Sequence, residues 1–460
     1  LHGDGGSRIF SADALDKRLR IPATASPEHK AELRQLKEMF GGDGSTKVDV
    51  VLTNPPFSMK KEAKEADQRE ILQEYESAFV SKDGTKKARS SLKSNVMFLE
   101  RYRDLLKPGT GRMLTVIDES VLNTSSAADH RSMLFRHFYI RAVISLPQDA
   151  FVEAGANVKT SILMLDRKDE PSDDQPGTFY ARSENIGYQG TRVNESLSDL
   201  PAVLAAFRRF QQSGSVDGSR KTHWTDRTKF FVAQLTDPSA RLDVEWHDPR
   251  HAEMERRLQA IAAKKGYVLA TLGGDDGLCT FVRGRAGDEY VSDGVPIIKV
   301  RNVTGEGINW QTDFVLPSFF DSVPGAHLKR GDVLVTTTGL GTIGRVDLLD
   351  TDERCMADGH VTSLRLKTPR QMDPDFLVHY LRSPLGQMQF ERYTVGCTGQ
   401  TELNDSDVAK VEVAFPKDGR AQNTVLAEAK RYDEAAARAR EESKRNRLLA
   451  RTEFERLLGL

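Results

Sequence analysis

The amino-acid sequence predicts an α/β protein. We expect a largely parallel, doubly wound sheet first, then an α+β module and one long terminal helix. Residues 1–168 alternate between buried-type strands and helices, residues 268–415 hold short strands separated by glycines, and residues 422–458 keep one helical pattern throughout. Strands that recur between helices are typical of parallel sheets, because parallel neighbours need crossover connections.

The N-terminal pattern can be followed element by element. Helical spacing at 96–106 places Phe98 and Tyr102 on one apolar stripe. The segment 58–91 is so rich in charge that we expect a mobile surface insertion. The remaining expected elements are strands at 48–53, 112–117, 141–147 and 158–166 and a helix at 130–140.

The rest of the chain is expected to fold as three further segments. Residues 169–247 connect the first domain to the next and include a helix at 199–212. Residues 248–416 form the α+β module, with a leading helix and another helix at 374–383. In residues 417–460, a 4-3-4-3 spacing of apolar residues predicts a coiled-coil helix. These residues are Val425, Ala429, Tyr432, Ala436 and Ala439.

Composition excludes several classes of protein. The 460 residues are 38% hydrophobic and 29% charged, and no apolar run reaches membrane-spanning length. The cysteines Cys279, Cys355 and Cys397 are too scattered for a disulfide framework or a zinc site, so we expect no metal and a cytoplasmic protein. The formal net charge of −1 means that any DNA-binding surface must be a local patch.

The most informative stretch is Asn54-Pro55-Pro56-Phe57, directly after the strand at 48–53. Two prolines cannot continue a strand interior, so the chain turns at the strand's carboxyl end, where open α/β sheets place ligands. The Asn54 side-chain oxygen and the Pro55 carbonyl are hydrogen-bond acceptors that suit an exocyclic amine on a planar heterocycle. Phe57 can stack on that heterocycle.

This chemistry suggests a methyl transfer to a base. An amine held between two acceptors becomes pyramidal, which localises its lone pair for attack on an activated methyl group. Within a duplex that amine is inaccessible, so the base must be flipped out of the helix. Stacking on Phe57, worth about 1–3 kcal/mol per base, would offset part of the unstacking cost.

The residues resemble modification subunits of type I restriction systems, which are S-adenosylmethionine-dependent N6-adenine DNA methyltransferases. Four segments within residues 1–168 carry the resemblance in order: LHGDGGSRIFSADAL, VDVVLTNPPF, FLERYRDLLKPGTGRMLTVI and RAVISLPQDAFVEAGANVKTSILML. It implies a Rossmann-like methyltransferase sheet. The family's glycine-rich cofactor loop is expected before Leu1, so we expect this sheet to be N-terminally incomplete and the chain to begin within a domain.

The resemblance also implies roles for particular residues. Asn54, Pro55, Pro56 and Phe57 would hold and activate adenine, Asp13 would contact the cofactor, and Phe151 would lie at the target-base pocket. Each has a structural alternative: a proline-rich turn for the motif, a helix cap or turn for Asp13, and ordinary core packing for Phe151. For Phe151, core packing is favoured.

The second half of the chain also contains a glycine-rich motif. Residues 339–344 fit a dinucleotide fingerprint after a strand, but a strand follows where a helix should, so we reject a nicotinamide or flavin site. Residues 250–458 instead resemble the target-recognition domain and spacer helix of type I specificity subunits. By chemistry alone, six residues there are candidate DNA contacts: Lys299, Arg301, Asn302, Lys329, Arg330 and Arg345. A solvated surface role is at least as plausible for each.

The sequence therefore predicts a fused modification and specificity polypeptide. It would bind double-stranded DNA and pair through the terminal helix with a second copy or with further restriction-modification subunits. A second hypothesis keeps the motif but has protein glutamine or RNA as the substrate. A third is a non-catalytic DNA-binding specificity module, or a truncated methyltransferase that needs a partner subunit.

Overall fold

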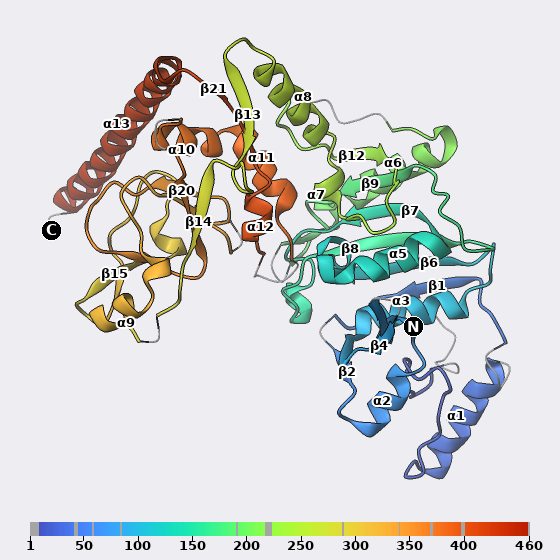
Figure 1. The fold of residues 1–460 in the computed structure, drawn as a ribbon. Coiled ribbons are helices and arrows are strands. Elements are labelled where there is room, and N and C mark those ends of the chain that lie inside the picture. Colours follow the sequence, from blue (N-terminus) through green and yellow to red (C-terminus); the bar gives the residue numbers. More distant parts are fainter. Residues whose placement is uncertain are drawn as a thin grey trace. The chain divides into compact units, whose positions relative to one another are not determined.

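The computed structural model describes residues 9–40, 45–57, 59–82, 85–189, 192–216, 223–287, 289–339, 341–368, 371–396 and 401–458 (Figure 1). The chain divides into two compact units. The first comprises Leu1–Arg250 and Val395–Gly399, and the second comprises His251–Thr394 and Gln400–Leu460. Each unit is described by itself.

A six-stranded sheet forms the centre of the first unit. Its order is β1 (Val50–Thr53), β6 (Arg112–Asp118), β8 (Thr160–Arg167), β7 (Phe138–Ser145), β9 (Thr178–Arg182) and β12 (Phe230–Ala233). The pairs β1–β6 and β7–β9 are parallel, whereas β8 runs antiparallel to both β6 and β7, and β12 is antiparallel to β9. The sheet is therefore mixed, and the expectation of a largely parallel sheet is corrected.

The connection from β7 to β8 explains this difference. Parallel neighbours require a crossover of a dozen or more residues, usually a helix. Among the described residues between these strands, the only helix is the three-residue η3 (Val152–Ala154). The chain therefore returns beside β7 as its antiparallel neighbour.

Helices cover both faces of the sheet. On one face, α3 (Ser94–Leu105) and α5 (Ala128–His137) pack in the main core with Val143 and Leu163. On the other face, α6 (Leu200–Ser213) packs on Ala142 and Phe179. Both faces of β7 are packed, with Ile140 and Val143 in the first core and Ala142 in the second, and the alternation shifts at an irregularity between Ile140 and Ala142.

Two expectations about this unit are corrected. Residues 169–247 were predicted to be a connecting region, yet they contribute β9 and β12 to the sheet. The segment 58–91 was predicted to be a mobile insertion, yet its described residues are folded, because Leu72 and Tyr75 are only 3% and 1% exposed. Its elements are β2 (Lys60–Glu62), α2 (Ala66–Leu72), η1 (Glu76–Ala78), β3 (Phe79–Lys82), β4 (Thr85–Ala88) and the start of β5 (Ser91–Lys93).

Short elements complete the first unit. Helix α1 begins with Pro27 directly after the N-cap Ser26, whose side chain accepts a hydrogen bond from His29 N. This helix spans Pro27–Met39. The other elements of the unit are α4 (Glu119–Asn123), η2 (Ser125–Ala127), β10 (Tyr188–Gln189), β11 (Arg192–Val193), η4 (Glu195–Leu197) and α7 (Val244–His247).

The second unit is an α+β module, as predicted. Its largest sheet has the order β14 (Cys279–Arg283), β20 (Val361–Leu366), β17 (Val333–Thr336) and β18 (Val346–Leu348). A three-stranded sheet holds β16 (Asp313–Val315), β15 (Val295–Ile298) and β19 (Met356–Ala357), and β13 (Tyr267–Thr271) pairs with β21 (Glu412–Pro416). The helices are α8 (Arg250–Ala262), η5 (Val300–Asn302), α9 (Pro317–Ser322), η6 (Pro324–Ala326), α10 (Pro374–Arg382), α11 (Pro384–Tyr393) and α12 (Asp405–Val408).

The rejected dinucleotide fingerprint lies in this unit. Strands β17 and β18 flank it and pair antiparallel, so the described glycines Gly339, Gly341 and Gly344 belong to a hairpin connection. All three have positive φ, the conformation that favours glycine. Leu340 lies outside the described residues. The expectation that a strand, and not a helix, follows these glycines is confirmed.

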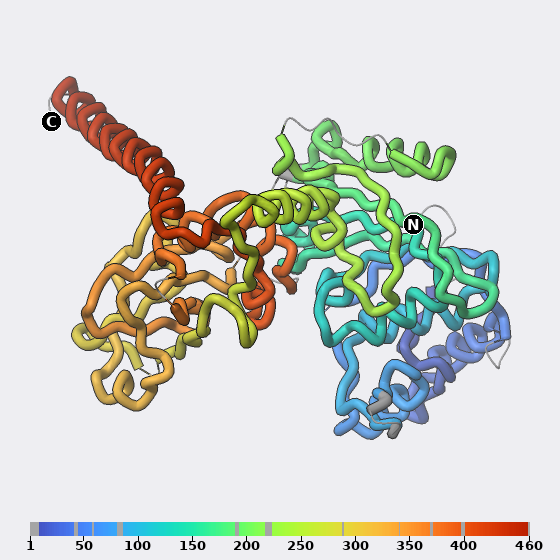
Figure 2. The backbone as a smooth tube through the Cα atoms, turned by 45° about the horizontal axis from the view of Figure 1, so that its top comes forward, coloured from blue at the N-terminus to red at the C-terminus, as the bar shows by residue number. Residues whose placement is uncertain are grey.

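The terminal helix is α13 (Gly419–Leu457), a continuous helix of 39 residues (Figure 2). Asp418 caps it by accepting hydrogen bonds from Arg420 N and Ala421 N. Val425 and Tyr432 on the predicted seam are 51% and 64% exposed, so pairing through this helix stays a prediction. Within the described ranges, neither this helix nor any other has the length and apolar character needed to cross a membrane.

Candidate active site

Helix α3 anchors the turn that follows β1. The Oγ1 of Thr53, the last residue of β1, lies 2.7 Å from the hydroxyl of Tyr102. Burial raises the pKa of Tyr102, so its phenol stays protonated at neutral pH. Beyond the strand, the carbonyl of Pro56 accepts a hydrogen bond of 3.2 Å from Ser94 Oγ. One contact precedes Asn54 and the other follows it, so the turn is fixed on both sides of the predicted catalytic amide.

The Asn54 amide is free to bind a ligand. Its side chain is exposed, and no described residue forms a hydrogen bond with it. The next residue, Pro55, is buried and has a fixed φ, which stiffens the backbone beside the amide. The turn therefore presents an unpaired amide oxygen.

Two aromatic residues that are distant in sequence meet beside this turn. The ring centroids of Phe57 and Phe151 lie 5.5 Å apart, and their planes meet at 68°, an edge-to-face arrangement. Both residues are half-buried rather than part of the closed core. Such a pair contributes about 0.5–1.5 kcal/mol beyond the area it buries. The structure thus brings together Phe57 and Phe151, although core packing was the favoured expectation for Phe151.

Sequence reasoning missed two acidic residues at the end of β6. Strands β1 and β6 are parallel, with Thr53 opposite Thr115, so Asp118 and Glu119 follow at the same edge of the sheet as the motif turn. Asp118 is 2% exposed and accepts a hydrogen bond from the Asn95 amide. The signal was present: two acidic residues directly after a buried strand.

Glu119 is the more unusual of the two. It is 4% exposed, and its Oε1 accepts hydrogen bonds from Ser161 Oγ at 2.7 Å and Ser145 Oγ at 3.3 Å. Burial raises the pKa of this carboxyl to about 7, against the opposing effect of the Lys159 ammonium. Glu119 therefore changes its charge near neutral pH, as few carboxyl groups do.

Asp13 has a structural role near the motif. Its Oδ1 accepts a hydrogen bond from Leu15 N at 3.0 Å, and its Oδ2 pairs with Lys61 Nζ at 2.6 Å. This geometry is the turn role that was the alternative for Asp13. Two carboxylate oxygens offer about four acceptor positions, so each keeps capacity for a ligand. Contact with a cofactor stays a prediction.

The predicted DNA contacts in the second unit are mostly engaged within the protein. Lys299 and Arg301 share the Asp313 carboxylate at 2.7 and 2.6 Å, and Lys299 also lies over the ring of Tyr290. These two cations lower the pKa of Asp313, so the carboxylate stays ionised and pairs with both of them. The cluster keeps a net charge of about +1, but each cation is held by a contact within the protein.

The remaining predicted contacts differ among themselves. Asn302 is fully buried, and its amide bonds to Lys299 N and to the carbonyls of two later residues, so it supports a loop and cannot read a base edge. Arg330 pairs with two aspartates, Arg345 donates to a backbone carbonyl, and Lys329 is exposed. The prediction for Asn302 is corrected by its burial.

Comparison with known proteins identifies part of the first unit. Residues 24–217 match the family model described as N-6 DNA Methylase. This segment contains the motif turn, Phe151 and Glu119 but not Asp13. No curated protein sequence matches the chain. The resemblance of this segment to N-6 DNA methylases is thus confirmed.

Similar solved structures include type I specificity and modification subunits. A specificity subunit from M. genitalium is 17% identical, with 36% of this chain and 39% of that one covered, at a TM-score of 0.28. A methyltransferase subunit from Streptococcus thermophilus is 21% identical, with 43% and 35% covered, at 0.27. The type IIG endonuclease BpuSI is 12% identical, with 84% and 49% covered, at 0.34. This chain spans less than half of each, and at these TM-scores the likenesses carry no structural argument.

Proposed function

We propose that this chain is a site-specific DNA methyltransferase of a restriction-modification system that methylates the exocyclic amine of adenine. The observation that carries the proposal is the exposed, unpaired amide of Asn54 beside the Phe57–Phe151 pair. Both lie in the segment that matches N-6 DNA methylases. S-adenosylmethionine would supply the activated methyl group, with Asp13 as the described residue that would hold it.

The protein's own residues account for the activation of the amine. The oxygen of Asn54 and the carbonyl of Pro55 accept the two amine hydrogens, which favours a pyramidal nitrogen with a localised lone pair. Phe57 stacks on the flipped base, an interaction worth about 1–3 kcal/mol. The edge of Phe151 holds the Phe57 ring in place. As the N–CH3 bond formed, the S–CH3 bond of the methyl donor would break and leave a neutral thioether. The amine nitrogen, positively charged at that point, would lose one proton to solvent.

The second unit would select the DNA sequence. We propose residues 248–416 as the target-recognition domain and residues 417–460 as a spacer that pairs with a second copy or with further restriction-modification subunits. A single recognition domain reads one half of a bipartite site, so such pairing would bring a second one. The protein would act in the cytoplasm on double-stranded DNA.

The test is sequencing of methylated adenine in the DNA of a methylation-free bacterium that expresses the gene from its native start codon. Methylation at one motif, lost with Asn54→Ala, would support the proposal. Because Asn54 is exposed and unpaired, the variant should keep its thermal stability, so a loss of methylation would not reflect unfolding. Absence of methylated adenine with the protein abundant and folded would contradict it and leave the DNA-binding alternative.

A second assay separates the alternative substrates. Purified protein would receive S-adenosylmethionine with a labelled methyl group and be offered duplex DNA, RNA and protein extract in parallel. Label in DNA alone supports the proposal, and label in RNA or protein alone contradicts it.

A further inference from the structure

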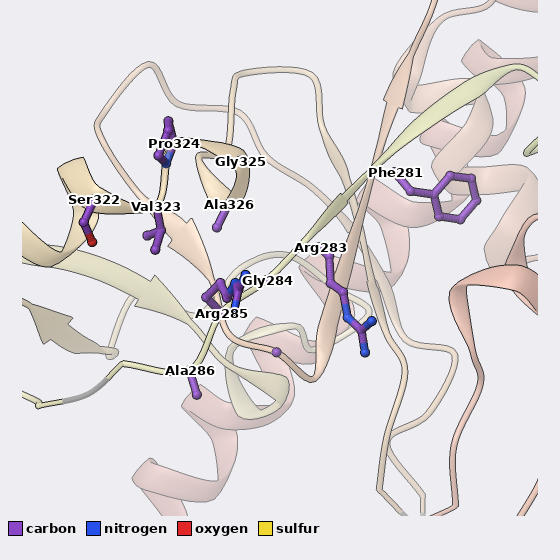
Figure 3. Close-up of a pocket in the computed structure, with 11 residues that line it drawn as sticks. Phe281, Arg283, Gly284, Arg285, Ala286, Ser322, Val323, Pro324, Gly325 and Ala326 are labelled. Carbon is purple, nitrogen blue, oxygen red and sulfur yellow. The ribbon is translucent and has the colours of Figure 1, made fainter.

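A cavity in the second unit has a lining with unusual charge. It has a volume of about 830 Å³ and lies between β14 with the turn that follows it and the segment from Ser322 to Ala326 (Figure 3). Among the described lining residues, Arg283 and Arg285 are the only charged ones. The wall opposite them carries small or apolar side chains such as Val323 and Ala326, and none of the lining residues that the structure describes is acidic.

Both arginines are uncompensated. They are exposed, and among the described residues no carboxylate pairs with either guanidinium. Two acidic residues adjoin the lining in sequence: Asp358, beside Gly359, is 8% exposed and accepts a hydrogen bond from His360 N, and Asp321, beside Ser322, pairs with Arg354. Lys299 and Arg301 differ from the two arginines of the cavity, because both of them pair with the same aspartate. The cavity therefore holds two positive charges that the protein itself does not neutralise.

The backbone beneath the arginines is held rigidly. Gly284, between them, packs so closely on the next segment that a Cβ there would lie 1.9 Å from the carbonyl oxygen of Asp358. Arg285 N also donates a hydrogen bond of 2.8 Å to the carbonyl of Ala357. The fixed backbone sets where the two side chains begin, and they extend from it in different directions (Figure 3). Because both side chains are exposed, a ligand must still order their guanidinium groups on binding.

We propose that this cavity binds the phosphate backbone of double-stranded DNA through Arg283 and Arg285. The inference rests on the proposed function, because it assigns to the second unit the phosphate contacts that such recognition needs. Guanidinium groups suit phosphate oxygens because they can donate two parallel hydrogen bonds. Arg283 is the last residue of β14 and Arg285 follows two residues later, so the two long side chains can contact different phosphates of one strand. Such contacts position the protein and do not read bases.

Salt dependence gives the test. Binding of the full chain to a short fluorescein-labelled B-form duplex would be measured by anisotropy at about 50–200 mM salt, since each phosphate contact contributes about 0.9 to the slope of log K against log salt. The double variant Arg283→Ala/Arg285→Ala should lower the slope by about 1.8, which is roughly a 60-fold loss at 0.1 M salt. Arg283→Lys/Arg285→Lys should keep most of the slope, because the charge remains.

Arg256→Ala is the matched control. Arg256 is equally a surface arginine of the second unit, 75% exposed in its side chain, but it pairs with Glu253. Its removal should leave the slope unchanged. A reduced slope in the double alanine variant alone supports the inference, and an unchanged slope in that variant overturns it.

Two further readouts separate related explanations. If the double alanine variant loses binding of inorganic phosphate while its DNA slope is unchanged, the cavity takes a free phosphate and the inference is overturned. Adenine methylation by the wild type, measured separately, bears only on the proposed function. An unchanged DNA slope with methylation intact would therefore refute this inference alone.

Discussion

Replacing the buried carboxyl of Glu119 should change how stability depends on pH. Its pKa is raised from 4.5 to about 7, chiefly by burial. Between these two values, the native state keeps a proton that the unfolded state has lost, so wild-type stability falls as the pH rises. Below about pH 4.5 the carboxyl is neutral in both states, and above about pH 7 the loss is complete.

The rise in pKa gives the magnitude of the effect. A rise from 4.5 to about 7, at 1.36 kcal/mol per pKa unit, corresponds to about 3 kcal/mol. Glu119→Gln has no proton to lose and keeps an oxygen for Ser161 Oγ. The stability of the variant relative to wild type should therefore rise by about 3 kcal/mol between pH 4 and pH 8.

Urea unfolding at several pH values measures this difference. His130 and His137 complicate the wild-type curve alone, because burial lowers the pKa of each to about 4, and they destabilise the native state as the pH falls below 6.5. They are present in both proteins, so their effect cancels in the difference. Glu153→Gln, which replaces an exposed carboxyl, serves as the control. A difference between Glu119→Gln and wild type that stays constant with pH would refute the raised pKa.

Two further predictions concern the aromatic pair and a corrected residue. Phe57→Ala and Phe151→Ala should each reduce adenine methylation, and the double variant should show a coupling of about 0.5–1.5 kcal/mol in kcat/KM; purely additive effects would contradict a shared role. Asn302→Ala should lower the free energy of unfolding by about 1–3 kcal/mol, because Lys299 N and the carbonyls of Asn309 and Gln311 lose their shared buried partner. Its DNA-binding salt slope should match that of wild type, and a reduced slope would restore Asn302 as a DNA contact.

Local patterns in the sequence were sufficient for the motif turn and for most helices. Two consecutive prolines end a strand in any fold. The terminal helix could be predicted because its apolar residues keep a helical spacing without interruption. Asn54 and Phe57 could be selected because their chemistry lies within four consecutive residues. A structural feature that depends only on consecutive residues can therefore be predicted from those residues alone.

Features that depend on distant residues could not be predicted in the same way. The direction of β8 depends on the missing crossover helix before it, whereas its own residues fit either direction. The charges of segment 58–91 outnumber the few apolar residues, such as Tyr75, that anchor it to the core. The pairing of two candidate DNA contacts could not be predicted for a related reason, since Asp313, which holds Lys299 and Arg301, is more than ten residues away in the sequence.

The motif turn after β1 is held in place by two elements, strand β6 and helix α3. Strand β1 has one hydrogen-bonded neighbour in the described sheet, β6, so the sheet steadies the motif from a single side. Helix α3 supplies the second support, through Tyr102 before the amide and Ser94 after it. Its buried residue Leu99 packs in the main core without belonging to the site. We therefore expect a shift in that packing to move the two contacts of α3 with the turn, and with them the Asn54 amide that we propose binds adenine.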